Sequence, residues 1–80
     1  MFVNAPENGR KNLCGEVLKK YRKKNGLTQE QMTARLQQGG FDMGKNMYQR
    51  VEDGSRHVPD FELSAISTVL GIPLSELLSL

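Results

Sequence analysis

Four polar side chains of the types that bind DNA bases lie close together just past the middle of this 80-residue chain: Lys45, Asn46, Gln49 and Arg50. In an α-helix this spacing places all four on one side, away from Tyr48 and Val51. Lys and Arg donate hydrogen bonds to guanine, whereas Asn and Gln form paired bonds with adenine in the major groove. The segment is therefore a candidate for reading a DNA sequence, and an ordinary exposed polar face of a helix is the alternative.

A second candidate site lies at residues 28–31, where the sequence Thr-Gln-Glu-Gln predicts the start of a helix. The Thr28 hydroxyl can accept a hydrogen bond from the N–H of Gln31, whose side chain can reach back to the backbone of Thr28. Free N–H groups and the dipole at this end favour an anion, so Thr28 and Gln29 could hold a DNA phosphate. A plain helix cap is the alternative, and the two roles are compatible. Three basic residues are further candidates for phosphate contacts: Arg10, Lys11 and Arg56.

Charge is concentrated in one part of the chain, although the net charge is only +2. All 11 Lys and Arg residues lie within residues 10–56 together with five acidic residues, which gives this range a charge of +6. Residues 57–80 carry three acidic residues and no Lys or Arg. A basic body with an acidic C-terminal end indicates a polyanionic partner on one side. A polarised surface without such a partner is the alternative.

The composition offers few residues for catalysis or metal binding, because the chain has one cysteine, Cys14, and one histidine, His57. A lone cysteine cannot form an internal disulfide, which favours a reducing cytoplasm, and a structural zinc site would need four Cys or His ligands. A Ser-His-Asp or Cys-His catalytic site would depend on His57, in a chain too short for a sizeable substrate cleft. No segment approaches the roughly 20 apolar residues of a membrane span, and the N-terminus lacks the pattern of a signal peptide. We therefore predict no enzyme activity, no metal, no cofactor and no membrane partner.

Helices must position the candidate side chains, and the spacing of apolar residues predicts five of them. The expected ranges are roughly 13–24, 29–37, 44–52, 60–70 and 73–79. Their ends carry residues that are typical of helix caps and stops: Asn12, Asn25-Gly26, Asp53-Gly54, Gly71 and Pro73. Asn is a preferred N-cap, Gly commonly ends a helix, and Pro fits the first turn.

The turn between the second and third helices is expected at residues 38–42, where two glycines disfavour a helix and the chain closes over Phe41. Residues expected to face the core are Leu13, Val17, Leu18, Tyr21, Met32, Leu36, Met43 or Met47, Tyr48, Val51, Leu63, Ile66, Ser67, Leu70, Leu74, Leu77 and Leu78. No segment has the pattern of a strand. The sequence thus predicts a compact all-α domain over residues 12–80, preceded by a flexible N-terminal arm over residues 1–11.

Three strings occur in an order that resembles the phage repressor/Cro-type, or XRE-like, helix-turn-helix family of transcriptional regulators. They are Arg22 with residues 26–32 (GLTQEQM), residues 48–54 (YQRVEDG), and Leu63 with residues 70–72 (LGI) and 77–78 (LL). Together they span roughly residues 12–79. The resemblance implies a five-helix, lambda-repressor-like DNA-binding domain, in which the second helix of the helix-turn-helix lies in the major groove.

Two features depart from the common pattern of this family. Thr33 occupies a position where the family usually has a small residue, mostly Ala, and the stretch from Gln37 to Met43 is longer than the usual turn. A subgroup with a Leu-Gln-x-x-Gly-x-Asp-Ile turn and an Arg-x-Val-Pro-Asp-x-Glu-Leu link resembles this chain more closely. The matching positions are Leu36-Gln37, Gly40, Asp42, Met43, Arg56, Val58-Pro59-Asp60 and Glu62-Leu63. The longer turn bears on the angle between the two helices that it joins.

The resemblance also implies roles for individual residues. Bases are usually read from the positions held here by Gly44, Lys45, Asn46 and Arg50. Gly44 has no side chain, so it could only let the backbone approach the DNA. Arg22 and Glu52 occupy positions that usually form an ion pair between the first helix and the end of the third. Such a pair is structural, because it would hold the reading helix at a fixed angle.

The function implied is that of a sequence-specific regulator of transcription, of bacterial or phage repressor type, which binds a palindromic operator in double-stranded DNA as a homodimer. Two-fold pairing would place the two reading helices about 34 Å apart. The apolar residues near the C-terminus could form the dimer contact or simply cover the core: Ile72, Leu74, Leu77, Leu78 and Leu80. A protein-interaction module on the same fold, such as an antitoxin-like or anti-repressor partner, is the alternative that the sequence leaves open.

Overall fold

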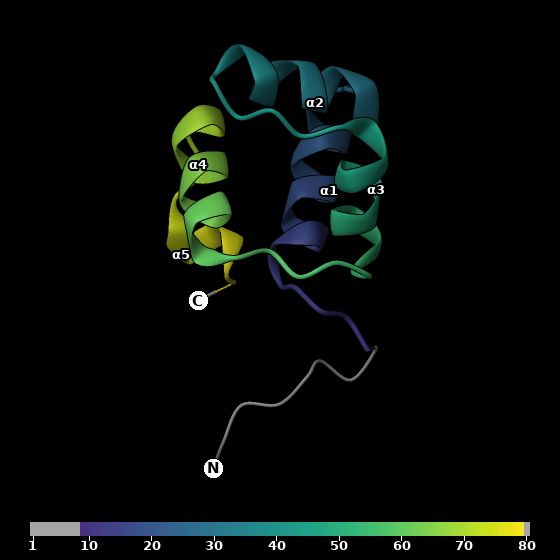
Figure 1. Cartoon of the computed structure of the whole chain (residues 1–80), viewed down its shortest axis with the longest axis vertical. Coiled ribbons are helices and arrows are strands. Elements are labelled where there is room, and N and C mark those ends of the chain that lie inside the picture. Colours follow the sequence, from purple (N-terminus) through teal and green to yellow (C-terminus); the bar gives the residue numbers. More distant parts are fainter. Residues whose placement is uncertain (1–8, 80) are drawn as a thin grey trace.

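The computed structural model describes residues 9–79, which form five α-helices and no strand (Figure 1). The helices are α1 (Cys14–Lys24), α2 (Gln29–Gln38), α3 (Lys45–Asp53), α4 (Asp60–Leu70) and α5 (Leu74–Leu77). The predicted all-α class is confirmed, and the first four helices begin and end within one residue of the predicted ranges. The fifth is a single turn, shorter than predicted, because the chain leaves helical geometry at Leu78 and Ser79 has a left-handed φ of 57°. Residues 1–8 of the predicted arm lie outside the described residues.

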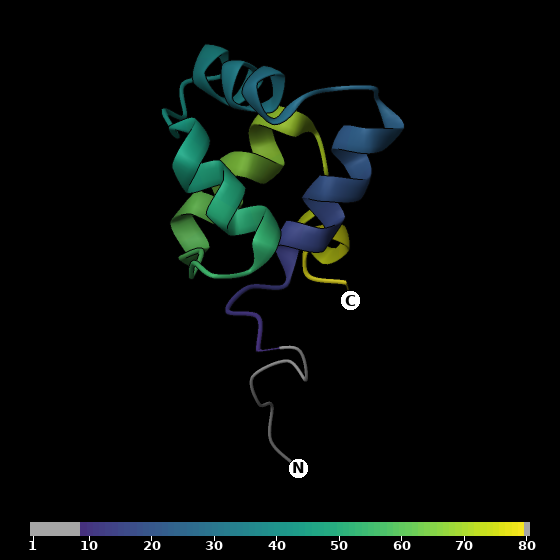
Figure 2. The same ribbon diagram turned by 90° about the vertical axis from the view of Figure 1, so that its right-hand side faces the viewer.

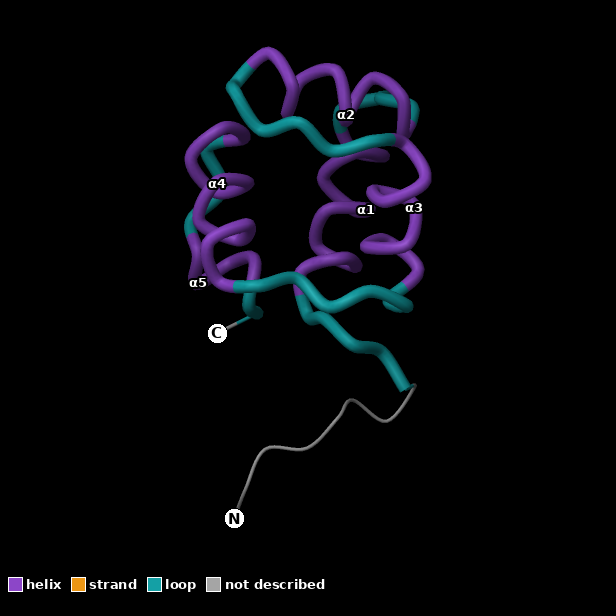
Figure 3. Tube along the Cα trace, in the orientation of Figure 1, coloured by secondary structure: helices purple, strands orange, loops and turns teal. Residues whose placement is uncertain are grey.

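Two groups of helices face each other across the core. α1 and α3 pack side by side, and α2 lies across their ends (Figures 1 and 2). α4 contacts α2 and α5, and α5 contacts α1, so these two helices close the other side. The loop at residues 39–44 joins α2 to α3, and the loop at residues 54–59 passes from α3 to α4 on the other side of the core (Figure 3). None of the five helices is long and apolar enough to cross a membrane.

Every helix contributes to one hydrophobic core. Its fully buried side chains are Cys14, Leu18, Met32, Leu36, Tyr48, Val51, Ile66 and Leu77. Burying a large apolar side chain stabilises a fold by about 1.5–3 kcal/mol relative to leaving it exposed. Tyr48 and Val51 lie one turn apart on α3, so the core fixes the inner face of this helix. Burial also raises the pKa of the Cys14 thiol to about 11, so this group stays protonated at neutral pH.

The inner face of α1 agrees with the prediction except at its first residue, since Leu18 is buried and Val17 and Tyr21 pack partly buried against the core. Cys14 is buried, whereas Leu13, predicted to face the core, is 51% exposed. The reason is that Leu13 precedes the first turn of α1 and the neighbouring Asn12 side chain turns inward instead. Leu74, which is also predicted to face the core, is 43% exposed, because α5 is a single turn that places Leu77 in the core instead.

The turn between α2 and α3 closes over Phe41, as predicted. Gly40 has a φ of 96°, a left-handed conformation that glycine adopts without strain. The Phe41 N–H donates to the Leu36 oxygen at 2.8 Å, and the Phe41 ring packs half-buried against the core. Met43 is buried at the end of this turn, whereas Met47, the alternative core residue, is 41% exposed. The turn therefore anchors the chain just before α3 begins.

α1 and α3 approach each other closely at Gly15. A Cβ placed on Gly15 would overlap the backbone oxygen of Val51 and Nη2 of Arg10, and it would lie 2.8 Å from Oδ1 of Asn12. Because the Val51 oxygen belongs to the backbone of α3, no rotation of a side chain can relieve this contact. The missing side chain at Gly15 therefore sets how closely the two helices pack.

We expect Gly15→Ala to lower the free energy of unfolding by about 1–3 kcal/mol, the usual cost of overpacking an interior. Helix propensity alone predicts the opposite sign, with a gain of up to about 1 kcal/mol for Ala over Gly. Urea denaturation followed by circular dichroism measures the change. Ser64→Ala, at an exposed position of α4, is the control and should change stability by less than about 0.5 kcal/mol. A Gly15→Ala protein as stable as the parent would contradict the close contact between α1 and α3.

Candidate nucleic-acid interface

The polar side chains of α3 that the sequence singled out all lie on the solvent side of the helix. The exposed residues are Lys45, Asn46, Gln49 and Arg50. On the opposite side Tyr48, Val51 and Glu52 are buried. In Figure 2, α3 (teal to green) lies at the front of the molecule, and no other described helix covers it. α3 thus presents an open polar face while its inner face is fixed by the core.

Gly44 lies just outside α3 as its N-cap residue, whereas the sequence placed it in the first turn. Its backbone is extended, with a ψ of 159°, and no described side chain caps the helix there. A Cβ on Gly44 would meet no described heavy atom within 4 Å. The first N–H groups of α3 therefore begin at an open surface, which leaves room for a ligand to approach the backbone.

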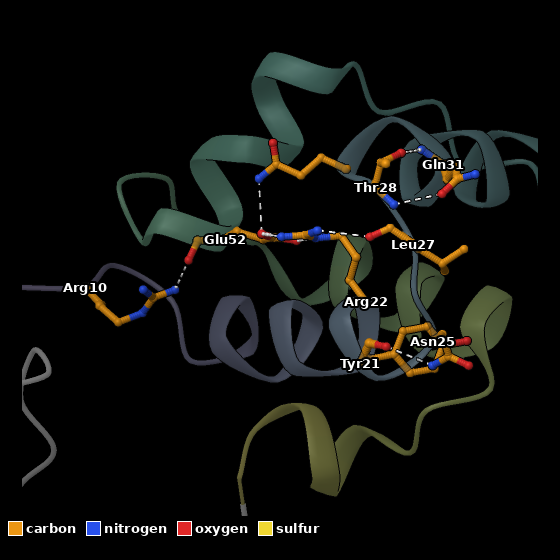
Figure 4. A network of polar contacts seen from close by, with 9 residues as sticks. Arg10, Tyr21, Arg22, Asn25, Leu27, Thr28, Gln31 and Glu52 are labelled. Atoms are coloured by element: carbon orange, nitrogen blue, oxygen red, sulfur yellow. Dashed lines mark hydrogen bonds and ion pairs between the residues drawn. The ribbon is translucent and has the colours of Figure 1, made fainter.

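Glu52, near the end of α3, ties this helix to α1 and α2 (Figure 4). Arg22 of α1 donates to both carboxylate oxygens, from Nε at 2.7 Å and from Nη2 at 3.1 Å. Gln29 of α2 donates from Nε2 to Glu52 Oε1 at 3.1 Å. Arg22 and Glu52 are the two residues that the family resemblance named as an ion pair. A two-pronged arginine–carboxylate pair has a defined geometry, so it fixes the angle of α3 relative to α1 and α2.

The Glu52 carboxyl is ionised although the residue is only 4% exposed. Burial by itself would raise the pKa of this carboxyl, but bonds from Arg22 and Gln29, together with the nearby Tyr48 hydroxyl, hold the pKa below its ordinary value. The hydrogen bond to Glu52 in turn raises the pKa of Arg22. Burial raises the pKa of the Tyr48 hydroxyl. All of these groups therefore keep one protonation state around neutral pH.

The N-terminus of α2 lies on the same surface as the start of α3. Thr28 Oγ1 accepts from the Gln31 N–H at 3.1 Å, and Gln31 Oε1 accepts from the Thr28 N–H at 2.8 Å, so the predicted capping box is present. An open hollow beside this end is lined by Arg22, Gly26, Leu27, Thr28, Gln29, Glu30 and Lys45. The hollow joins the positive end of α2 to Lys45 of α3, which makes it a suitable place for an anion.

The basic side chains expected at phosphates have different surroundings. Lys11 is exposed. The Arg56 guanidinium donates to both carboxylate oxygens of Glu62, at 2.7 and 3.0 Å. Arg10 donates to two backbone oxygens at the C-terminal end of α3, at 2.8 and 3.3 Å. Because Arg10, Arg56 and Gln29 already donate within the protein, a phosphate would have to share or replace these bonds.

Asn12 has contacts that its predicted role as a helix cap does not include. Its Oδ1 accepts from the Gly15 N–H at 2.8 Å, which is the expected capping bond. Its Nδ2 also donates to the oxygens of Val51 at 3.0 Å and Arg56 at 2.8 Å. These partners lie 39 and 44 residues further along the chain, so no local pattern in the sequence indicates them. Gln29 and Glu52 lie 23 residues apart, so no local pattern in the sequence indicates their bond either.

Comparison with known proteins is consistent with this arrangement of helices. The helix-turn-helix family model matches residues 18–77. Control protein C.MunI from a Mycoplasma species is 42% identical over 66 residues, which cover 81% of this chain and 82% of that protein. No solved structure matches the chain. The range matched by the family model contains α2, the turn and α3.

We expect Glu52→Gln to lower the free energy of unfolding at neutral pH by about 3 kcal/mol, because Arg22 would lose its counter-charge. The lowered pKa of Glu52 means that its contribution is complete above the ordinary glutamate pKa of about 4.3 and is lost as the pH falls through the folded-state pKa. The difference between the variant and the parent should therefore shrink below about pH 4. Urea denaturation of both proteins between neutral pH and about pH 3 measures this difference in the free energy of unfolding.

Glu76→Gln is the control for this experiment, since Glu76 is an exposed glutamate of α5. It should leave stability nearly unchanged at neutral pH. A difference between Glu52→Gln and the parent that stays constant down to about pH 3 would contradict the proposed ionisation of Glu52.

Proposed function

The chain belongs to the helix-turn-helix family and is a DNA-binding transcriptional regulator, and we propose that it reads double-stranded DNA with the outward face of α3. The major groove is about 12 Å wide, enough to admit one helix. Lys45, Asn46, Gln49 and Arg50 then reach the base edges, and Gly44 lets the backbone approach. The observation that carries this proposal is that all four side chains are exposed on a helix whose opposite face is buried and held by an ion pair.

We propose that DNA phosphates bind at the N-terminus of α2 and beside the end of α3. Thr28 and Gln29 lie where the helix dipole and free N–H groups attract an anion, next to the hollow that Lys45 also lines. Lys11 is exposed, and its backbone is bonded to the residue that ends α3. Such contacts fix the register of a protein on DNA without reading the sequence. A phosphate contact from Arg56 stays a prediction, whereas the bonds from Arg10 to the end of α3 point to a different role for this residue.

We also propose that two copies pair through α5 on a palindromic operator. A domain of this size covers about one half-site, and a two-fold pair places the reading helices about 34 Å apart. Leu74 is 43% exposed and Leu78 is partly buried, which leaves apolar surface on α5 for a second copy. Ile72 and Leu77 are buried in the core instead. Leu80 lies outside the described residues.

The direction and place of regulation are part of the same proposal. Resemblance to phage repressors favours repression of a bacterial or phage promoter. The Mycoplasma relative carries the name of a control protein, which fits regulation in either direction. The regulator would act in the cytoplasm, where it reaches DNA.

We expect Arg50→Ala and Asn46→Ala each to flatten the preference among duplex sequences by about 1–3 kcal/mol, because each removes bonds to a base. Gln29→Ala should weaken binding to every duplex, since it removes a phosphate contact, which carries no sequence information. Selection of bound sites from random duplexes identifies the operator. Gel shifts on this operator and on its single-base variants then measure the preference.

Arg35→Ala is the matched control for Arg50→Ala. It removes the same charge from an exposed position of α2 that lies beside α1 and α4, away from the polar face of α3. The preference among sequences should survive this change. Unchanged preference in both Arg50→Ala and Asn46→Ala would rule out this face of α3 as the reading surface, and no binding to any duplex by the parent would favour the protein-interaction alternative.

Sedimentation equilibrium at high micromolar concentration tests the pairing. We expect about twice the chain mass of 9.0 kDa for the parent, and a shift toward the monomer for Leu74→Glu. Met47→Glu is the matched control, because Met47 is 41% exposed on α3, close to the 43% of Leu74. A parent protein that remains monomeric both with and without its operator would exclude the homodimer.

A further inference from the structure

We propose that residues 10–12 form a strap that fixes the C-terminal end of α3, and that Arg10 and Asn12 act as positioning residues for base reading. The inference rests on the proposed function, in which α3 is the reading helix. The strap binds the end of α3 through hydrogen bonds between residues that lie 39 to 44 positions apart in the chain. It includes two residues, Arg10 and Lys11, that the sequence assigned to a flexible arm.

Arg10 and Lys11 hold backbone oxygens at the end of α3. Arg10 Nη2 donates to the Glu52 oxygen at 2.8 Å, drawn in Figure 4, and to the Val51 oxygen at 3.3 Å. The backbone N–H of Lys11 donates to the Gly54 oxygen at 2.8 Å. The last oxygens of a helix have no partner within the helix and carry partial negative charge. A guanidinium at this place is therefore favourable both as a donor and as a charge.

Gly54 provides the space in which the Arg10 side chain lies. Its φ of 83° is left-handed, as is common for the glycine that ends a helix. A Cβ on Gly54 would lie 2.8 Å from Cγ and Cζ of Arg10. The Arg10 side chain is only 13% exposed, and its Nε lies 3.6 Å from Glu16 Oε1. Arg10 is thus packed onto the protein along most of its length.

Asn12 forms the second attachment of the strap. Its amide lies between the oxygens of Val51 and Arg56, so it bridges the last turn of α3 and the loop that follows. Asn12 is only 8% exposed. A side chain buried to this extent is out of reach of DNA. Any effect of Asn12 on base reading must therefore act through the position of α3.

The strap acts on the part of α3 that carries Arg50. Val51 and Glu52, whose oxygens the strap binds, directly follow Arg50 in the sequence. Asn46 lies in the first turn of α3, next to the turn that closes over the core. Loss of the strap would therefore displace Arg50 more than Asn46. A reading side chain that must be ordered on binding loses affinity for its base.

Two variants test the strap without removing the parts that surround it. Arg10→Met keeps a long side chain over Gly54 but has no donor. Asn12→Ser keeps an oxygen that can cap α1 but cannot reach the Val51 and Arg56 oxygens. For both we expect the preference at the base read by Arg50 to fall about fivefold to tenfold, while the preference at the base read by Asn46 changes less than about twofold.

The readout is the affinity for the selected operator and for its single-base variants, measured at several salt concentrations. The temperature is one at which circular dichroism shows each variant to be folded. A purely structural defect lowers the folded fraction and so reduces all affinities by one factor, leaving the ratios among sequences unchanged. A change in these ratios is therefore specific to positioning of the reading helix.

Lys11→Met is the matched control, because it makes the same substitution at the adjacent basic residue and keeps the backbone bond to Gly54. It should leave the ratios among sequences unchanged and reduce the slope of log affinity against log salt by about 1, as expected for a lost phosphate contact. Arg10→Met and Asn12→Ser should instead keep the slope of the parent protein.

Unchanged ratios in both Arg10→Met and Asn12→Ser would overturn the strap. A uniform loss of affinity in Arg10→Met, with a salt slope lower by about 1, would also overturn it and make Arg10 a phosphate contact. Failure of the proposed function is distinguishable, because Arg50→Ala would then leave the ratios unchanged as well.

Discussion

The orientation of α3 depends on one buried carboxylate. Glu52 lies between Arg22 of α1 and Gln29 of α2, so a single charged group joins three helices. Taking these charges out of water is unfavourable by several kcal/mol, and well-placed hydrogen bonds offset that loss. Such a pair adds little net stability compared with an apolar contact, but it restricts the helices to one geometry. For a helix that presents side chains to a ligand, this restriction matters more than the stability.

Around this pair, α3 is held at three further places by different means. Tyr48 and Val51 anchor its inner face in the core, and the turn over Phe41 anchors its start. The proposed strap at residues 10–12 anchors its end. A helix of nine residues is unstable by itself in water, so the rest of the fold must supply its rigidity. A helix that is rigid before binding loses less entropy when its side chains meet the DNA.

Local signals in the sequence account for the accuracy of the predicted helices. The capping box of Thr28 and Gln31 and the glycines at positions 54 and 71 act within one turn of their own helix, and a single sequence contains such signals in full. The polar face of α3 followed from the same helical spacing. Arg22 and Glu52 are 30 residues apart, so only the family resemblance, and no local pattern, joined them.

The sequence by itself determined five helices, their order and the polar character of one face of α3. Only the tertiary structure decided which of several similar residues enters the core or meets a distant partner. Leu13 and Cys14 both fit the spacing of an inner face, and the choice between them depends on Asn12, which turns inward to bind the end of α3. An arginine suits a phosphate as well as a helix end. In the structure the Arg10 guanidinium donates to the end of α3, because the fold brings backbone oxygens from about 40 residues away within its reach.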